Sequence, residues 1–196
     1  DTPVTGWTDG DTAWVTDTDG ENSWAVYNKT SPWQQDEFLR ENSPVTNSLF
    51  GASISKSTDG TVVLVGKPGD SDGKVVAFTL VASAYVELVT VAAPGGASGF
   101  GNALAQGDTA YVAVAASATN SNRGAVYIYS VDGSSLTLEQ TLTKAGASVN
   151  DAFGTSIAMS ANSKWLYVGT PGSNQVFAYG FDVADNTYKL VSTITA

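Results

Sequence analysis

Apolar and polar residues alternate with a period of two along most of the chain, in short runs separated by turn residues. The runs are rich in Val, Tyr and Ile, which predicts strands; examples are VVLVG at 62–66, AVYIYS at 125–130 and WLYVG at 165–169. The one charged stretch with helical spacing, DEFLREN at 36–42, is too short to form a stable helix alone. The pattern therefore predicts an all-β protein.

The predicted strands recur in a fixed order after three Phe-Gly pairs, Phe50-Gly51, Phe100-Gly101 and Phe153-Gly154, which are 50 and 53 residues apart. Each pair is followed by an alternating stretch, a polar turn, a β-rich run, a loop rich in Gly, Asp or Asn, and two further strands. The first 46 residues fit the same frame without the pair, because TDGDTAWV at 8–15 aligns with TDGTVVLV at 58–65. WAVYN at 24–28 then takes the place of the third strand, and DEFLR at 36–40 that of the fourth. The chain is therefore a repeat protein.

Each unit is expected to contain four short strands, and the units cover residues 1–46, 47–96, 97–149 and 150–196. Four-stranded antiparallel units with a period near 50 residues are typical of β-propeller blades, which bury their two faces by stacking on their neighbours. We expect a single propeller-type domain or a partial propeller. Because the chain is in phase with the repeat at both ends, part of a larger ring is favoured. A closed four-bladed ring and a dimer that completes one ring are alternatives.

The recurring residues have mechanical interpretations within a blade. Phe is expected to fill the gap between neighbouring blades, and the Gly after it to let the backbone turn into the innermost strand. The Asp59-Gly60 turn predicts a tight hairpin between the first two strands. Its counterpart SANSK at 160–164 lacks an acidic residue, so the turn is expected to be structural. The Pro residues of Gly66-Lys67-Pro68 and Gly169-Thr170-Pro171 should end the second strand.

Composition removes several classes of function. The net charge of −10 disfavours nucleic acid and anionic membranes, and no apolar run is long enough to span a bilayer. The absence of Cys excludes disulfides, thiolate zinc sites and a Cys nucleophile. The absence of His removes the usual general base of Ser-His-Asp chemistry and the His ligands of metals.

The phrase FGASISKSTDGTVVLVGKP at 50–68 and its counterpart at 153–171 resemble the FG-GAP repeat of integrin α-chain propellers. The resemblance covers about 150 residues, although the third unit lacks the second half of the motif and the first unit lacks both halves. It implies a propeller that serves adhesion, ligand binding or scaffolding at the cell surface or outside the cell. The family's calcium loop between the first two strands does not carry over, because the turn at 57–60 offers one carboxylate.

Two acidic loops between the second and third strands are candidate calcium sites. Their carboxylates are Asp17, Asp19 and Glu21 in the first unit and Asp70 and Asp72 in the second. Alternating carboxylates before Gly can converge on a hard cation, but both loops are short and lack the late bidentate Glu of an EF-hand. The alternative is a polar turn whose side chains cap their own backbone.

Aromatic residues and one sequon suggest contacts in the first unit. Four of the five Trp residues lie there. Trp14 and Trp24 fall on strand positions and are expected in the core. Trp7 and Trp33 lie in or beside turns and are candidates for binding a protein or a glycan. Asn28 begins the only N-glycosylation sequence pattern.

No spacing of carboxylates selects an acid–base pair, and TDTDGENSW at 16–24 misses the sialidase-type Asp box because Asp19 and Gly20 are adjacent. The sequence therefore predicts a non-enzymatic adhesion or scaffold module that binds a protein partner, or further copies of itself, through blade loops. A carbohydrate-binding propeller and an accessory propeller domain of a larger secreted enzyme are the alternatives. Calcium is the one cofactor that the sequence suggests.

Overall fold

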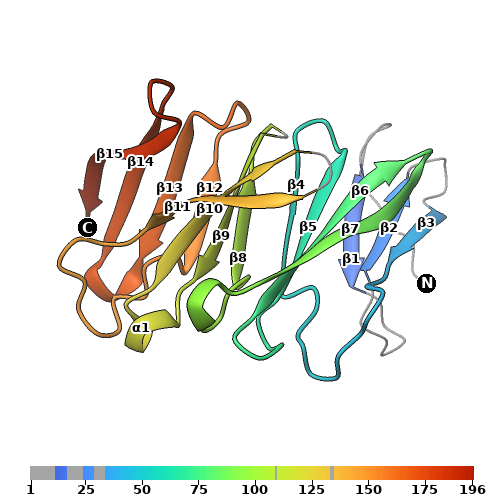
Figure 1. The fold of residues 1–196 in the computed structure, drawn as a ribbon, viewed down its shortest axis with the longest axis horizontal. Coiled ribbons are helices and arrows are strands. Elements are labelled where there is room, and N and C mark those ends of the chain that lie inside the picture. The colour runs from blue at the N-terminus through green and yellow to red at the C-terminus, as the bar shows by residue number, and fades with distance from the viewer. Residues whose placement is uncertain (1–11, 17–23, 29–33, 109, 133–134) are drawn as a thin grey trace.

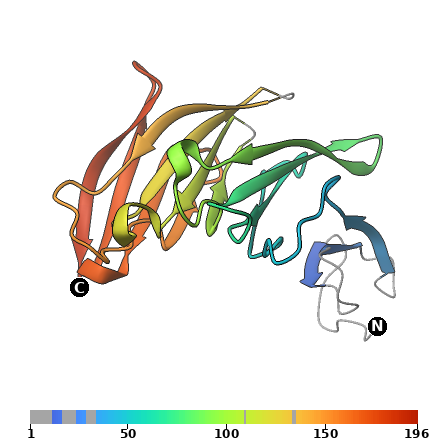
Figure 2. The same ribbon diagram turned by 60° about the horizontal axis from the view of Figure 1, so that its bottom comes forward.

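The computed structural model describes residues 12–16, 24–28, 34–108, 110–132 and 135–196, which form four antiparallel sheets. The sheets follow one another in a row along the chain, with the N-terminus at one end and the C-terminus at the other (Figure 1). A view turned by 60° shows the same order, with the first and last sheets far apart (Figure 2). The predicted all-β array of propeller-type blades is confirmed.

The first sheet has three described strands and the other sheets have four, always in sequential order. We name them sheet 1 and blades 2, 3 and 4. Sheet 1 contains β1 (Thr12–Thr16), β2 (Trp24–Asn28) and β3 (Gln34–Leu39). Blade 2 contains β4 (Ser53–Lys56), β5 (Val62–Lys67), β6 (Lys74–Val81) and β7 (Ala84–Ala92).

Blade 3 contains β8 (Ala103–Gln106), β9 (Tyr111–Ala116), β10 (Ala125–Val131) and β11 (Leu136–Leu142). Blade 4 contains β12 (Ser156–Met159), β13 (Trp165–Thr170), β14 (Gln175–Asp182) and β15 (Thr187–Thr195). Three single helical turns lie in the connections: η1 (Pro94–Gly96), α1 (Thr119–Asn122) and η2 (Pro171–Ser173). Among the described residues no helix is long and apolar enough to cross a membrane.

Every sheet carries a bulge at the same place, directly before an aromatic residue of its penultimate strand. The aromatic residues that follow the bulge are Tyr27, Phe78, Tyr129 and Tyr179. In each four-stranded blade the Phe of the Phe-Gly pair packs edge-on against this ring, with centroid distances of 6.3, 6.2 and 6.4 Å. A repeated bulge and a repeated aromatic contact therefore fix the same twist in each blade.

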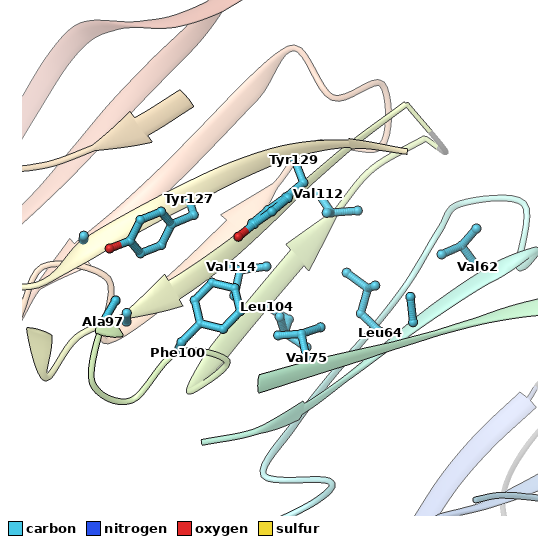
Figure 3. Packing of buried hydrophobic residues seen from close by; sticks show 13 residues of the cluster. Val62, Leu64, Val75, Ala97, Phe100, Leu104, Val112, Val114, Tyr127 and Tyr129 are labelled. Carbon is cyan, nitrogen blue, oxygen red and sulfur yellow. The ribbon is translucent and has the colours of Figure 1, made fainter. Parts of the chain in front are cut away.

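The core lies between the sheets. Figure 3 shows Phe100 and Tyr127 of blade 3 facing Leu64 and Val75 of blade 2, as members of one buried cluster. A second cluster joins Ala113 and Ala115 of blade 3 to blade 4, and a third joins blade 2 to Leu39 at the end of β3. The expectation that Phe fills the gap between blades is met at Phe100 and Phe153, which are fully buried at these junctions.

The chain turns from one blade into the next at a Phe flanked by two residues with positive φ. In blade 4 these are Ala152 (φ 55°) and Gly154 (φ 89°) around Phe153. The N–H of Gly154 donates to the carbonyl of Gly169 at 3.0 Å, which starts the innermost strand against the second strand. The same bond recurs from Gly51 to Gly66 and from Gly101 to Ala115.

Candidate functional site at the crossover face

The connections from one blade to the next share one end of the sheets with the loops between second and third strands. We call this end the crossover face. In blade 2, Ser53 pairs with Gly66 and Lys74 pairs with both Lys67 and Ala92, so these strand ends lie together. Loops of a propeller carry function more often than its packed strands do, so charged residues on this face are the first candidates.

Two glycines let neighbouring blades meet closely at this face. A Cβ added to Gly73 or Gly124 would lie 2.2 or 2.0 Å from the carbonyl oxygen of Phe100 or Phe153. Each glycine follows a residue whose carbonyl accepts the N–H of the incoming Phe: Asp72 accepts from Phe100 at 3.1 Å and Arg123 accepts from Phe153 at 3.0 Å. Asp72 and Arg123 therefore hold equivalent backbone positions at successive junctions.

A buried ion network lies where β3 leads into blade 2. Lys67 stands at the end of β5, with only 3% of its side chain exposed, and its Nζ donates to Oε2 of Glu41. The Oδ2 atom of Asp70 lies 3.1 Å from Nζ of Lys67 and 3.1 Å from Nζ of Lys74. The Oε1 atom of Glu41 is buried with no hydrogen-bond partner among the described residues. The ion pair between Glu41 and Lys67 thus joins the connection of residues 40–52 to the end of β5.

The pKa values of this network move in opposite directions. Burial lowers the pKa of Lys67, but the hydrogen bonds to Glu41 and Asp70 outweigh it, so the net shift is upward. Burial raises the pKa of Asp70, but hydrogen bonds from Lys67 and Lys74 outweigh it, so the net shift is downward. Lys67 and Asp70 are therefore both charged across the neutral pH range.

A second ion pair holds the connection into blade 4. Asp151 is buried beside Phe153, and its Oδ2 accepts from Nζ of Lys144 at 3.0 Å and from the N–H of Ser148 at 2.6 Å. These two hydrogen bonds lower the pKa of the Asp151 carboxyl. Nε of Arg123 donates to the carbonyl of Ala147 at 3.1 Å. This carboxylate, like that of Asp70, serves the packing of a connection.

Asp72 is the acidic residue of this face that keeps an exposed side chain outside any ion pair among the described residues. Its carboxylate lies beside the η1 turn, since Oδ2 is 3.4 Å from a Cβ placed on Gly96. Glu41, Asp70 and Asp151 are buried. Asp72 is thus the carboxylate that a small molecule could reach most directly.

The opposite end of the sheets, which we call the hairpin face, carries tight turns whose polar residues hydrogen-bond to one another. Asp59 accepts hydrogen bonds from Ser57 and Thr61, and the backbone N–H of Thr61 and the Ser57 hydroxyl lower its pKa. Asn162 takes the same place in blade 4, where it accepts from Ser160 and from the N–H of Lys164. The amide substitutes for the acid without loss of the turn, as the comparison of the two turn sequences predicted.

Some predicted site residues cannot be compared with the structure. Trp7, Asp17, Asp19, Glu21 and Trp33 lie outside the described residues. Asn28 ends β2, where its backbone pairs with Thr12 and Gln34, and its glycosylation stays a prediction.

The structure places Asp70 and Asp72 in one loop but gives them different surroundings. A cation on Asp70 would have to displace two ammonium groups. Within the described part of the chain, no group of three or more His, Cys, Asp or Glu side chains could hold a metal ion. Calcium binding by the acidic loops stays a prediction.

Sequence reasoning did not identify Glu41, Arg123 or Asp151 as members of this face. The available signal was Lys67, a cation at the end of an apolar strand that must be buried if the blades stack. Such a cation requires acidic partners. These are Glu41, 26 residues before Lys67, and Asp70, three residues after it, and their separation in the sequence does not identify them.

No protein-family model matches the sequence, and no curated protein matches it. Solved structures do match. A protein of Bacteroides uniformis assigned as a 6-phosphogluconolactonase has a TM-score of 0.62 and 15% identity, over 89% of this chain and 52% of that chain. The periplasmic gluconolactonase PpgL of Pseudomonas aeruginosa has a TM-score of 0.59 and 19% identity, over 89% and 48%.

Hydrazine synthase of Kuenenia stuttgartiensis has a TM-score of 0.66 and 16% identity, over 95% of this chain and 60% of that chain. The chain spans between 48% and 60% of the length of these three solved structures. At these identities the likeness shows the fold and leaves the activity open.

The comparisons correct three predictions from the sequence. The FG-GAP resemblance is wrong, because no family model matches and three of the matched propellers are named as lactonases. The repeated phrase at 50–68 and 153–171 forms the first two strands of a blade and the turn between them. Any stacked four-stranded blade needs the same buried Phe and the same tight turn, so the phrase does not identify one family. The predictions of a non-enzymatic adhesion or scaffold module and of a structural protein are also wrong, because the matched propellers are named as enzymes. The chain shares the fold of propeller enzymes.

Proposed function

We propose that this chain is part of a propeller enzyme that hydrolyses sugar lactones. The observation that supports this most is the likeness of nearly the whole chain to three proteins named as 6-phosphogluconolactonases or gluconolactonases. A lactone is an internal ester. Its hydrolysis adds one water to the carbonyl carbon, breaks the ring C–O bond and yields a hydroxy acid.

Asp72 is our candidate for the general base. Lactone hydrolysis needs a group that takes a proton from the attacking water, and the chain has no His for that purpose. Asp72 is exposed on the crossover face, where the carboxylates of Asp70 and Asp151 are already held in ion pairs. The proton taken from water would then be delivered to the ring oxygen as it leaves. Arg123, at the equivalent place of the next junction, is our candidate for binding the anionic product or a sugar phosphate.

The test is an assay of the purified protein with D-glucono-1,5-lactone and with its 6-phosphate, by titration of the acid released at constant pH. We expect hydrolysis above the spontaneous rate and a fall of about 10²-fold or more in kcat for Asp72→Asn. The control is Asp185→Asn, because Asp185 is an exposed carboxylate on the hairpin face. No rate above background with either lactone would refute the proposal, and equal loss in both variants would refute the role of Asp72.

We place the enzyme outside the cytoplasm as part of the same proposal, because one of the matched proteins is a periplasmic gluconolactonase. Calcium dependence is a separate point. Calorimetry with calcium, comparing the protein with its Asp17→Asn/Asp19→Asn variant, would detect a site in the first acidic loop. No heat and no rise in Tm would end the calcium hypothesis.

A further inference from the structure

The residue that precedes the innermost strand differs between the blades. Asn102 holds this place before β8, while Ala52 precedes β4 and Thr155 precedes β12. The side chain of Asn102 is partly exposed. Its Oδ1 accepts the N–H of Ser117, the residue directly after β9, at 2.9 Å, so the amide lies at the crossover face. Among the three four-stranded blades, blade 3 alone carries an amide side chain at this place.

The oxygen of this amide has a structural role. The pairing of the first two strands makes Ser117 the equivalent of Pro68 and Pro171 in blades 2 and 4. Proline has no N–H, so those blades have no backbone donor to satisfy at this position. Ser117 has one, and Oδ1 of Asn102 accepts it. This contact accounts for the oxygen of the amide and leaves its NH2 group without a structural explanation.

The NH2 group of Asn102 is oriented and only partly used. The N–H of Ser117 can only donate, so it fixes Oδ1 on its own side and Nδ2 on the other. Nδ2 lies 3.5 Å from the carbonyl oxygen of Gly154, which is at the long end of hydrogen-bond distances. The second hydrogen of Nδ2 has no acceptor among the described residues. The amide therefore offers a free donor at the crossover face.

Asn102 lies between the two charged residues proposed above for lactone hydrolysis. Two residues before it, the N–H of Phe100 donates to the backbone carbonyl of Asp72 at 3.1 Å. On its other side, Phe153 directly precedes the residue that Nδ2 faces and donates its own N–H to the carbonyl of Arg123 at 3.0 Å. The donor thus stands where the junction of Asp72 and the junction of Arg123 meet.

We propose that Nδ2 of Asn102 donates a hydrogen bond to the carbonyl oxygen of the lactone and to the oxyanion that forms from it. This inference rests on the proposed lactone hydrolysis. As water attacks the carbonyl carbon, an electron pair moves to the carbonyl oxygen, and the amide N–H stabilises the negative charge there. Asp72 takes the proton of the water. The carbonyl then reforms, the ring C–O bond breaks, and the ring oxygen takes the proton, while Asn102 stays neutral throughout.

The test uses two variants that separate the donor from the structural role of the oxygen. Asn102→Ala alone would leave the N–H of Ser117 without an acceptor, and a loss of activity would then be mixed with a loss of stability. Asn102→Ala in a Ser117→Pro background removes that N–H as well and reproduces the Ala52 and Pro68 arrangement of blade 2. The comparison is with Ser117→Pro alone, so the two proteins differ only at Asn102.

We expect kcat for D-glucono-1,5-lactone to be about 10²-fold lower in the double variant than in Ser117→Pro, with little change in KM, because the donor acts mainly on the transition state. The two variants should have nearly the same Tm. Equal kcat values, or a change confined to KM, would overturn the role of Asn102 and leave lactone hydrolysis itself intact.

Asn102→Asp keeps the test decisive if the double variant does not fold. The carboxylate still accepts the N–H of Ser117 but has no hydrogen to donate, so kcat should again fall by about 10²-fold or more. An Asn102→Asp variant as active as the wild type would overturn the inference. No hydrolysis of either lactone by the wild type would instead refute the proposed function, and this inference with it.

Discussion

At the scale of single residues, the junctions between blades depend on positions where a side chain has no room. Gly73 and Gly124 precede the third strand of blades 2 and 3, with φ of 108° and 84°, and each forms a parallel bridge with the Phe of the next blade. The backbone of the next blade occupies the volume that a side chain would need. The positive φ of Gly73 and Gly124, and the absence of a side chain there, are therefore both required for the next blade to pack closely.

The first prediction concerns Gly124→Ala. The new Cβ would lie 2.0 Å from the carbonyl oxygen and 2.6 Å from the nitrogen of Phe153, so the junction must open. We expect a loss of about 3 kcal/mol or more in the free energy of unfolding, measured by urea titration. Gly95→Ala is the control, because Gly95 also has positive φ (+59°) but nothing within 4 Å of its Cβ position. That change should cost about 1 kcal/mol. Equal losses would show that backbone strain, and not close approach, governs Gly124.

At the scale of elements, alternation predicted most strands well because each strand of a stacked blade has two distinct sides. Runs such as 62–66 and 165–169 became β5 and β13, and DEFLR at 36–40 largely became the outer strand β3, although it has helical spacing. Pairing with β2 supplies hydrogen bonds that an isolated helix of this length could not match. The α1 turn was not predicted, since Asn120, Ser121 and Asn122 have positive φ and are held by the next blade.

The candidate site was less predictable than the strands. Asp70 and Asp72 were found from their spacing, but nothing in that spacing shows that one is buried between two lysines and the other exposed. That difference arises from the packing of residues 40–52 on blade 2, which is a contact between distant parts of the chain. Local sequence thus defines blades, and the chemistry of their loops depends on the stack.

The second prediction concerns the ion network between elements. Lys67→Met removes the cation, which leaves the buried carboxylate of Glu41 without its ion-pair partner and leaves Asp70 with Lys74 alone. Breaking such a pair by removing one partner costs about 3–5 kcal/mol of stability, and we expect a loss of that size by urea titration. Lys189→Met is the control, because Lys189 pairs with Asp182 and Asp185 at the surface, and its loss should be much smaller. A Lys67→Met variant as stable as Lys189→Met would contradict a structural role for the network.

The third prediction is the pH dependence of the same network. The pKa of Asp70 is below its ordinary value of 3.8 in the folded protein. A depressed pKa gives stability that is present above 3.8 and is lost as the pH falls through the folded value. The difference in stability between the wild type and Asp70→Asn should therefore be largest at neutral pH and shrink below pH 3.8. Urea titrations at pH 7 and at pH 3 would measure it, and a constant difference would contradict the assigned direction.

At the scale of the whole molecule, a row of stacked sheets is stabilised by contacts between neighbours. Blade 3 is the best-supported sheet in this row, since one cluster covers its side toward blade 2 and another its side toward blade 4. Blade 4 has a covered side and an exposed side, and this is visible in the alternating burial of β13. In such arrays local stability follows the number of covered faces, so protection should differ between blades of nearly identical design.

We therefore expect backbone amides of β9 to exchange with deuterium more slowly than those of β13, after correction for intrinsic rates. Both segments are second strands of four-stranded blades, so their own hydrogen-bond ladders are alike and the difference reports stacking. Equal protection of the two strands would mean that the row opens only as a whole. In that case the number of covered sides of a blade would not determine its local stability.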